Sequence, residues 1–166
     1  NASAWTNAID LNPDSLKSAL LGSYTAGLGV TEPGEPTGSP NHTVDNVGRI
    51  DFILLKFSRA VNLNSIYLNV YDIGPGNADS DATVFYRHGA TDPANGVLSN
   101  LYFSQFTSIN APGNGASGTR NVNSGNAYAN TWLVSAAIGP PSEGFNDGFK
   151  LKTVTVSVPE PTTWAM

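Results

Sequence analysis

Aspartates beside turns and strand starts are the residues of this chain best suited to bind a ligand. They lie at three places: Asp45 with Asp51, then Asp79 with Asp81, and finally Asp147 before the last predicted strand. Ca²⁺ binds six to eight oxygen atoms from carboxylates, amides and carbonyls, so these five side chains are candidate calcium ligands. The alternative is that they cap turns by accepting hydrogen bonds from nearby backbone N–H groups. Calcium is the one cofactor that the sequence suggests, and the EF-hand pattern is missing.

Catalytic chemistry has little support in the sequence. The two histidines, His42 and His88, are too few for a three-histidine zinc site, and the chain has no cysteine. No Gly-x-Ser-x-Gly motif surrounds any of its serines. We therefore predict that the protein is not an enzyme and assign no catalytic residue.

Aromatic and amide side chains suggest contacts with sugars. Tyr67 and Tyr71 lie on one face of a predicted strand, where their rings could stack on a carbohydrate, although aromatic residues at this spacing also pack between sheets. Asn1 and Asn41 each begin an Asn-x-Ser/Thr sequence and are candidate glycosylation sites.

Short polar residues gather in the loop that precedes residue 51. We expect their side chains to form a hydrogen-bonded network that ties this loop to neighbouring strands without a disulfide. Glycine in this loop permits a positive φ that would strain another residue. The predicted network consists of Asn41, His42, Asp45, Asn46, Gly48 and Asp51.

Short β-rich runs separated by turn residues must position these side chains. The predicted strands are residues 50–57, 65–72, 83–87, 101–106, 131–138 and 149–158. Segments dense in Gly, Pro, Asn and Ser, such as residues 111–126, lie between them. Residues 50–57 are almost continuously apolar, as expected of a strand covered on both faces. We predict an all-β fold: an antiparallel, jelly-roll-like β-sandwich with long Gly/Pro/Asn-rich loops and at most one short helix.

The two ends of the chain leave alternatives open. Residues 12–20 could form a helix with a proline in its first turn, but a strand running toward Tyr24 fits about as well. Near the C-terminus the apolar residues change from odd to even positions between Leu151 and Val154, which predicts a β-bulge near residues 152–153. We expect one domain over residues 1–158, with residues 1–15 as a candidate extended arm.

Composition excludes several classes of protein. Charged residues make up 13% of the 166 residues and the net charge is −5, while Asn, Ser and Thr together number 48. Eight scattered basic residues argue against binding to nucleic acid, which needs clustered positive charge. No apolar run is long enough to span a bilayer. Little charge and no cysteine suit an exported bacterial β protein from which a signal peptide has been removed.

The C-terminal segment carries a resemblance to a known family. Pro159, Glu160 and Pro161 follow a valine-rich predicted strand and precede Thr-Thr-Trp-Ala-Met. Residues 159–166 resemble the start of a PEP-CTERM sorting signal, in which Pro-Glu-Pro precedes a hydrophobic segment and a basic tail recognised by an exosortase. The hydrophobic segment and the basic tail are absent from this sequence. The resemblance implies a precursor anchored in the membrane through such a segment.

The body of the chain is also similar to a domain common among exosortase-dependent surface proteins. The similarity lies in residues 27–30, 39–48, 51–54, 79–81 and 146–152. It implies an extracellular or cell-surface location and no known catalytic residue. We therefore expect a structural subunit of the extracellular matrix or biofilm, a homo-oligomer or filament joined through residues 1–15 or 157–166. The alternative is a carbohydrate-binding module that retains extracellular polysaccharide.

Overall fold

Antiparallel strands make up almost all of the structure. The computed structural model describes residues 1–8, 16–36, 42–74, 78–87, 102–111, 113, 115–122, 125, 127–138 and 146–160. Its strands are β1 (Ala2–Ala8), β2 (Lys17–Tyr24), β3 (Gly27–Thr31), β4 (Val44–Asp45), β5 (Arg49–Val70), β6 (Ala82–Arg87), β7 (Thr107–Ala111), β8 (Gly118–Asn121), β9 (Ala129–Ala136) and β10 (Gly148–Ser157). Within these residues there is no α-helix, and one 3₁₀ turn, η3, spans Phe103–Gln105. No helix in this part of the chain could cross a membrane.

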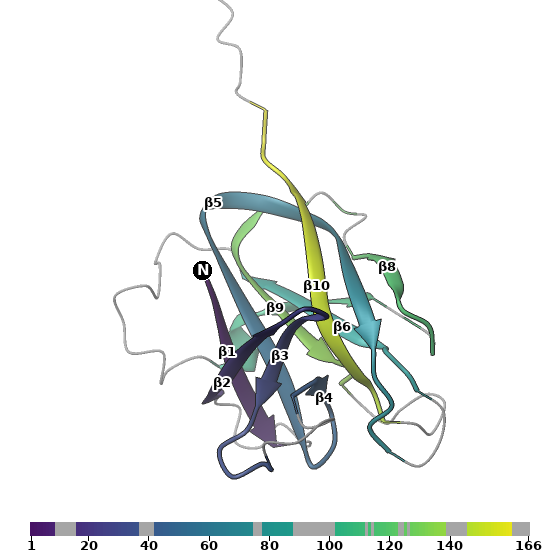
Figure 1. Cartoon of the computed structure of the whole chain (residues 1–166). Helices are drawn as coiled ribbons and strands as arrows, with labels where there is room; N and C mark the ends of the chain where they lie inside the picture. Colours follow the sequence, from purple (N-terminus) through teal and green to yellow (C-terminus); the bar gives the residue numbers. More distant parts are fainter. Residues whose placement is uncertain are drawn as a thin grey trace, which may run out of the picture.

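The long strand β5 closes the sheet on itself. Its first half pairs with β1 and β9, and its second half pairs with β10 and β8 (Figure 1). Strand β1 pairs with β2, β2 pairs with β3, and β3 pairs with β10. Together with β5 these strands form a closed ring of five, and β9, β6 and β7 extend the sheet on one side. The predicted all-β, antiparallel fold is thus confirmed.

Two hydrophobic clusters occupy the two faces of the first half of β5. Ile53 and Leu55 belong to the larger cluster, which also contains Trp132 and Phe149. The alternate residues Ile50, Phe52 and Leu54 pack on the other face with Trp5 and Leu133. The prediction that this strand is covered on both faces is confirmed. Successive side chains of a strand point to opposite faces, so each cluster receives alternate residues of β5.

Several predicted elements need correction. Residues 50–57 and 65–70 belong to the single strand β5, which continues without a break through residues 58–64, and residues 71–72 lie beyond its end. The described part of the predicted strand 101–106 is not a strand, since Phe103–Gln105 forms the 3₁₀ turn. The predicted loop 111–126 contains β8, whose backbone pairs with β5.

The N-terminal segment also differs from the extended arm that was a candidate for residues 1–15. Strand β1 is paired on both edges, with β2 and with β5, so residues 2–8 are an internal strand and not a free arm. Residues 17–24 form β2, which supports the strand alternative over the helix for this part. Residues 9–15 lie outside the described part of the chain.

The predicted β-bulge in the last strand is confirmed. Leu151 lies opposite Leu68, and Thr153 lies opposite Tyr67, so Lys152 is the extra residue. Phe149 and Leu151 before the bulge are buried in the larger cluster, whereas Val156 beyond it is 36% exposed. The bulge therefore separates a buried half of β10 from an outer half that extends beyond the ring (Figure 1).

Candidate functional site

Asn46 joins three segments that are distant in the sequence. It follows β4, and its side-chain nitrogen donates to Asp147 Oδ2 at 2.7 Å and to the Ala137 carbonyl at 3.3 Å. The Asp147 backbone nitrogen donates in return to Asn46 Oδ1 at 2.9 Å. Both side chains are buried. This reciprocal pair fixes the β4–β5 turn to the start of β10 and the end of β9.

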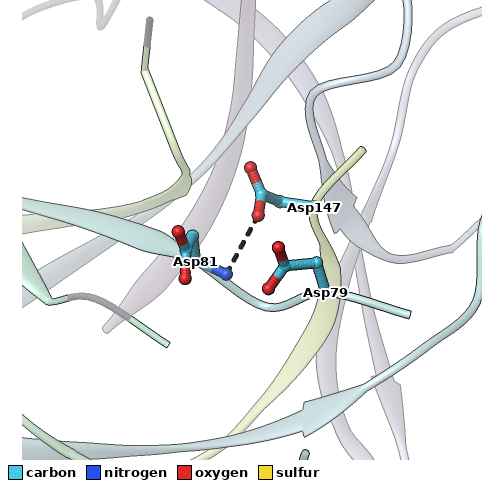
Figure 2. A group of neighbouring side chains, drawn as sticks. All are labelled: Asp79, Asp81 and Asp147. Carbon is cyan, nitrogen blue, oxygen red and sulfur yellow. Dashed lines mark hydrogen bonds between the residues drawn. The ribbon is translucent and has the colours of Figure 1, made fainter. Parts of the chain in front are cut away.

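Three of the five predicted calcium ligands come together beside this pair. Asp79 and Asp147 form an isolated parallel bridge, and the carboxylates of Asp79, Asp81 and Asp147 each offer an oxygen within 4.8 Å of the others (Figure 2). Two ligands on one Ca²⁺ ion, each about 2.4 Å from it, are at most about 4.8 Å apart. The spacing of the three oxygens therefore fits one divalent cation.

Backbone donors hold these carboxylates in place. Asp79 Oδ1 accepts from Ser80 N at 2.7 Å, Asp81 Oδ1 accepts from Gly113 N at 2.7 Å, and Asp147 Oδ1 accepts from Asp81 N at 3.0 Å. These bonds are the turn-capping contacts that the sequence also predicted for these aspartates, as the alternative to calcium binding. Burial, followed by the charges of Asp79 and Asp81, raises the pKa of Asp147 to about 7. The fixed carboxylates thus repel one another, and either a proton or a cation would relieve the repulsion.

Calcium is expected to raise the melting temperature by a few degrees at pH 8 and by less at pH 5. At the lower pH a proton occupies Asp147 and competes with the cation. The measurement is thermal unfolding of EDTA-treated protein with and without Ca²⁺, together with calorimetric titration. Asp147→Asn should abolish the response, whereas Asp72→Asn at an exposed position should retain it. Calorimetry without heat and unchanged melting at pH 8 would exclude calcium binding.

The other two predicted ligands belong to a separate acidic group. Asp45 accepts hydrogen bonds from Thr43 Oγ1 at 2.8 Å and Val47 N at 3.0 Å, and burial raises its pKa to about 6. Asp51 is 2% exposed and its Oδ1 has no hydrogen-bond partner. Burial, and then the charges of Asp45 and Glu32, raise the Asp51 pKa to about 9. Asp51 is therefore protonated at neutral pH.

The predicted loop network is thus divided between these two groups. Asn46 bonds to Asp147, whereas Asp45 bonds within its own loop. Gly48 has a φ of 75°, the positive value that the sequence suggested. His42 Nδ1 lies 2.8 Å from the hydroxyl of Thr31. Asn41 lies outside the described residues.

A pocket of about 500 Å³ opens beside His42 at the β2–β3 hairpin. Its lining residues are Ser23, Tyr24, Thr25, Ala26, His42, Tyr71 and Lys150. The Tyr24 and His42 rings stack with centroids 5.5 Å apart and an interplanar angle of 16°. The Lys150 ammonium lies 4.1 Å from the Tyr24 ring centroid and 5.3 Å from that of Tyr71, and donates to the His42 carbonyl. Aromatic walls with one cation are typical of a small-ligand site.

Glycine at position 29 allows this pocket to form. A Cβ on Gly29 would lie 1.8 Å from the His42 carbonyl oxygen, so no other residue fits without moving that strand or loop. Asn69 Nδ2 donates to the Ala26 carbonyl at 2.5 Å, and Lys152 donates to the Thr25 carbonyl, which fixes the hairpin over β5 and β10. Hydrogen bonds from these two side chains to backbone carbonyls therefore hold the hairpin side of the pocket in place.

The two tyrosines proposed to stack on sugars are separated by the structure. Tyr71 lines the pocket, whereas Tyr67 is 36% exposed on β5, opposite Thr153 and Thr119. Sequence reasoning missed Tyr24 and Lys150. One signal was present, because Lys150 lies between the apolar residues Phe149 and Leu151 and so faces away from the core, but nothing in the sequence placed aromatic rings around it.

The remaining predicted residues lie at the ends of the described chain. Pro159 and Glu160 are exposed after β10, and Pro161 lies outside the described residues. Asn1 is exposed, and its backbone pairs with Lys56.

No family model, no curated protein and no solved structure matches this chain.

Proposed function

We propose that this protein is an exported structural subunit of a bacterial extracellular matrix or cell surface, whose copies assemble through the outer half of β10. The PEP-CTERM-like segment 159–166 and the low-charge composition support export. The proposal includes a membrane-anchored precursor and assigns no catalytic residue.

The free edge of β10 is the observation that carries the proposal. From Thr153 to Ser157 one edge of β10 pairs with β5. On the other edge, β3 and β4 pair with β10 only as far as Leu151, and no other described strand is paired there. Val156 and Val158 are 36% and 47% exposed at this end. An uncovered edge with exposed apolar side chains is a template for pairing with another chain.

Acceptor edges are present on the same molecule. Among the strands described, β7 pairs only with β6, and β8 pairs only with β5. When the donor and acceptor edges differ, the contact is head-to-tail and propagates into an open filament. Since β1 is internal, the C-terminal strand is the donor in this proposal and residues 2–8 are not.

Replacing Val156 and Val158 by lysine is expected to abolish assembly while leaving the fold intact. Charged side chains at an exposed edge oppose pairing between copies. Electron microscopy and size-exclusion chromatography of the protein and its variants measure the effect. Val47→Lys is the matched control, because Val47 is also 47% exposed but lies in the β4–β5 turn. Monodisperse monomers at all concentrations, or filaments that persist in the double variant, would contradict the proposal.

Carbohydrate binding is the second candidate function, and the pocket at Tyr71 favours it. The pocket volume is within the range of small-ligand sites, and its aromatic lining suits the apolar face of a sugar ring. Affinity electrophoresis in gels containing matrix polysaccharides is the test. Tyr71→Ala should lose retardation, and Tyr67→Ala, outside the pocket, should keep it. Equal mobility of the protein in all gels would exclude this function.

A further inference from the structure

Among the described residues, no carboxylate forms a salt bridge with Lys150. Lys150 is 6% exposed, although lysine is seldom buried without a partner. Within the described residues the one salt bridge joins Arg49 to Glu32, away from the pocket lining. The partners of the Lys150 ammonium are the His42 carbonyl and the Tyr24 and Tyr71 rings, all of which are uncharged.

An anion is the ligand that this arrangement favours. Removing an ammonium from water is unfavourable unless an opposite charge pairs with it, and burial lowers the Lys150 pKa accordingly. No Asp or Glu of the described segments lines the pocket, although the chain carries a net charge of −5. A bound carboxylate would pair with Lys150 in a partly dehydrated site, where such a contact is stronger than at an open surface.

The lining also restricts the shape of the ligand. Tyr71 and Tyr24 offer ring surfaces, while Ser23 and Thr25 supply hydroxyl groups near the hairpin. A ligand that satisfies all of these groups has an apolar ring face, several hydroxyls and one carboxylate.

We infer that this pocket binds sugar residues that carry a carboxylate, the hexuronates of acidic polysaccharides, with the carboxylate paired to Lys150 and the ring against Tyr71. This inference rests on the second candidate function and specifies its ligand class. It is independent of assembly through the outer half of β10, because Lys150, the lining residue that belongs to β10, lies in the buried half of that strand.

The test is calorimetric titration with oligogalacturonate and with its methyl ester, which has the same rings but no charge. Wild-type protein should bind the acid about tenfold more tightly than the ester, because the ester cannot form the ion pair. Lys150→Met should bind both with the affinity of the ester. Lys17→Met is the matched control, since Lys17 is an exposed lysine at the start of β2 and outside the pocket lining, and it should retain the preference.

The possible outcomes distinguish this inference from the function on which it rests. Equal affinity of wild-type protein for acid and ester, or an unchanged preference in folded Lys150→Met, would overturn the role of Lys150 and leave carbohydrate binding in place. Binding of neutral oligosaccharides alone would do the same. If no oligosaccharide binds, both the inference and the carbohydrate function fail. Tyr71→Ala supplies a second readout, because it should weaken acid and ester alike.

Discussion

Asp51→Asn is expected to raise the melting temperature by more than about 10 °C at pH 8 and to have little effect near pH 4, given that 1 kcal/mol corresponds to about 2–4 °C in a chain of this size. Asp51 is almost fully buried, and its pKa is about 9 in the folded protein against 3.8 for an aspartate in water. At pH 8 the unfolded chain releases this proton and the folded chain retains it, which costs about 1.4 kcal/mol for every pH unit above the unfolded pKa. Asparagine is neutral at every pH and removes this cost.

The sign of the pH dependence follows from the same values. Because the folded pKa lies above the unfolded one, the folded state holds more protons between about pH 4 and pH 9, and stability falls as the pH rises through that range. The raised pKa values of Asp45 and Asp147 act in the same direction. Wild-type protein should therefore melt highest near pH 4 to 5.

Circular dichroism melts across the pH range measure the effect. Asp51→Asn should flatten the curve of melting temperature against pH, and the remaining slope should come from Asp45 and Asp147. Asp72→Asn is the matched control at an exposed position and should leave the curve as it is in wild type. A curve for Asp51→Asn that parallels the wild-type curve would show that Asp51 does not hold a proton in the fold.

Local patterns in the sequence predicted the strands whose alternate residues are apolar and pack into the core. Residues 50–55 alternate between two clusters, and the parity change after Leu151 located the bulge, because both depend only on neighbours along one strand. Strands β2 and β8 were uncertain or missed because their exposed or half-exposed residues have little periodicity. Backbone pairing with β1, β3 and β5 fixes them instead.

The candidate sites depend on contacts that no local pattern reveals. Asp79 and Asp81 were predictable as a pair, but Asp147 joins them only because β10 begins beside the segment before β6. Likewise, Lys150 meets Tyr24 across 126 positions because the β2–β3 hairpin folds over β10. Sequence reasoning supplied residue types suited to each chemistry, and the closed ring of strands determined which of them meet.

Asn46→Ala is expected to destabilise the fold by about 3–5 kcal/mol, because it leaves buried polar groups without partners. Three hydrogen bonds are lost: two with Asp147 and one with the Ala137 carbonyl. Asp147 would keep the bond from Asp81 N but lose the one side-chain donor that the described residues give it. A chain without cysteine has no disulfide that could hold β4, β9 and β10 together when this link is broken.

Chemical denaturation at pH 7 measures the loss, with Asn121→Ala as a matched control at an exposed position in β8, where a change within about 0.5 kcal/mol is expected. Asn46→Asp separates hydrogen bonding from charge. It keeps an acceptor for Asp147 N but adds a fourth carboxylate to the group of Asp79, Asp81 and Asp147, so its cost should be greater at pH 8 than at pH 5. A fold that tolerates Asn46→Ala as well as Asn121→Ala would show that strand pairing alone closes the ring at this end and that the buried polar link is dispensable.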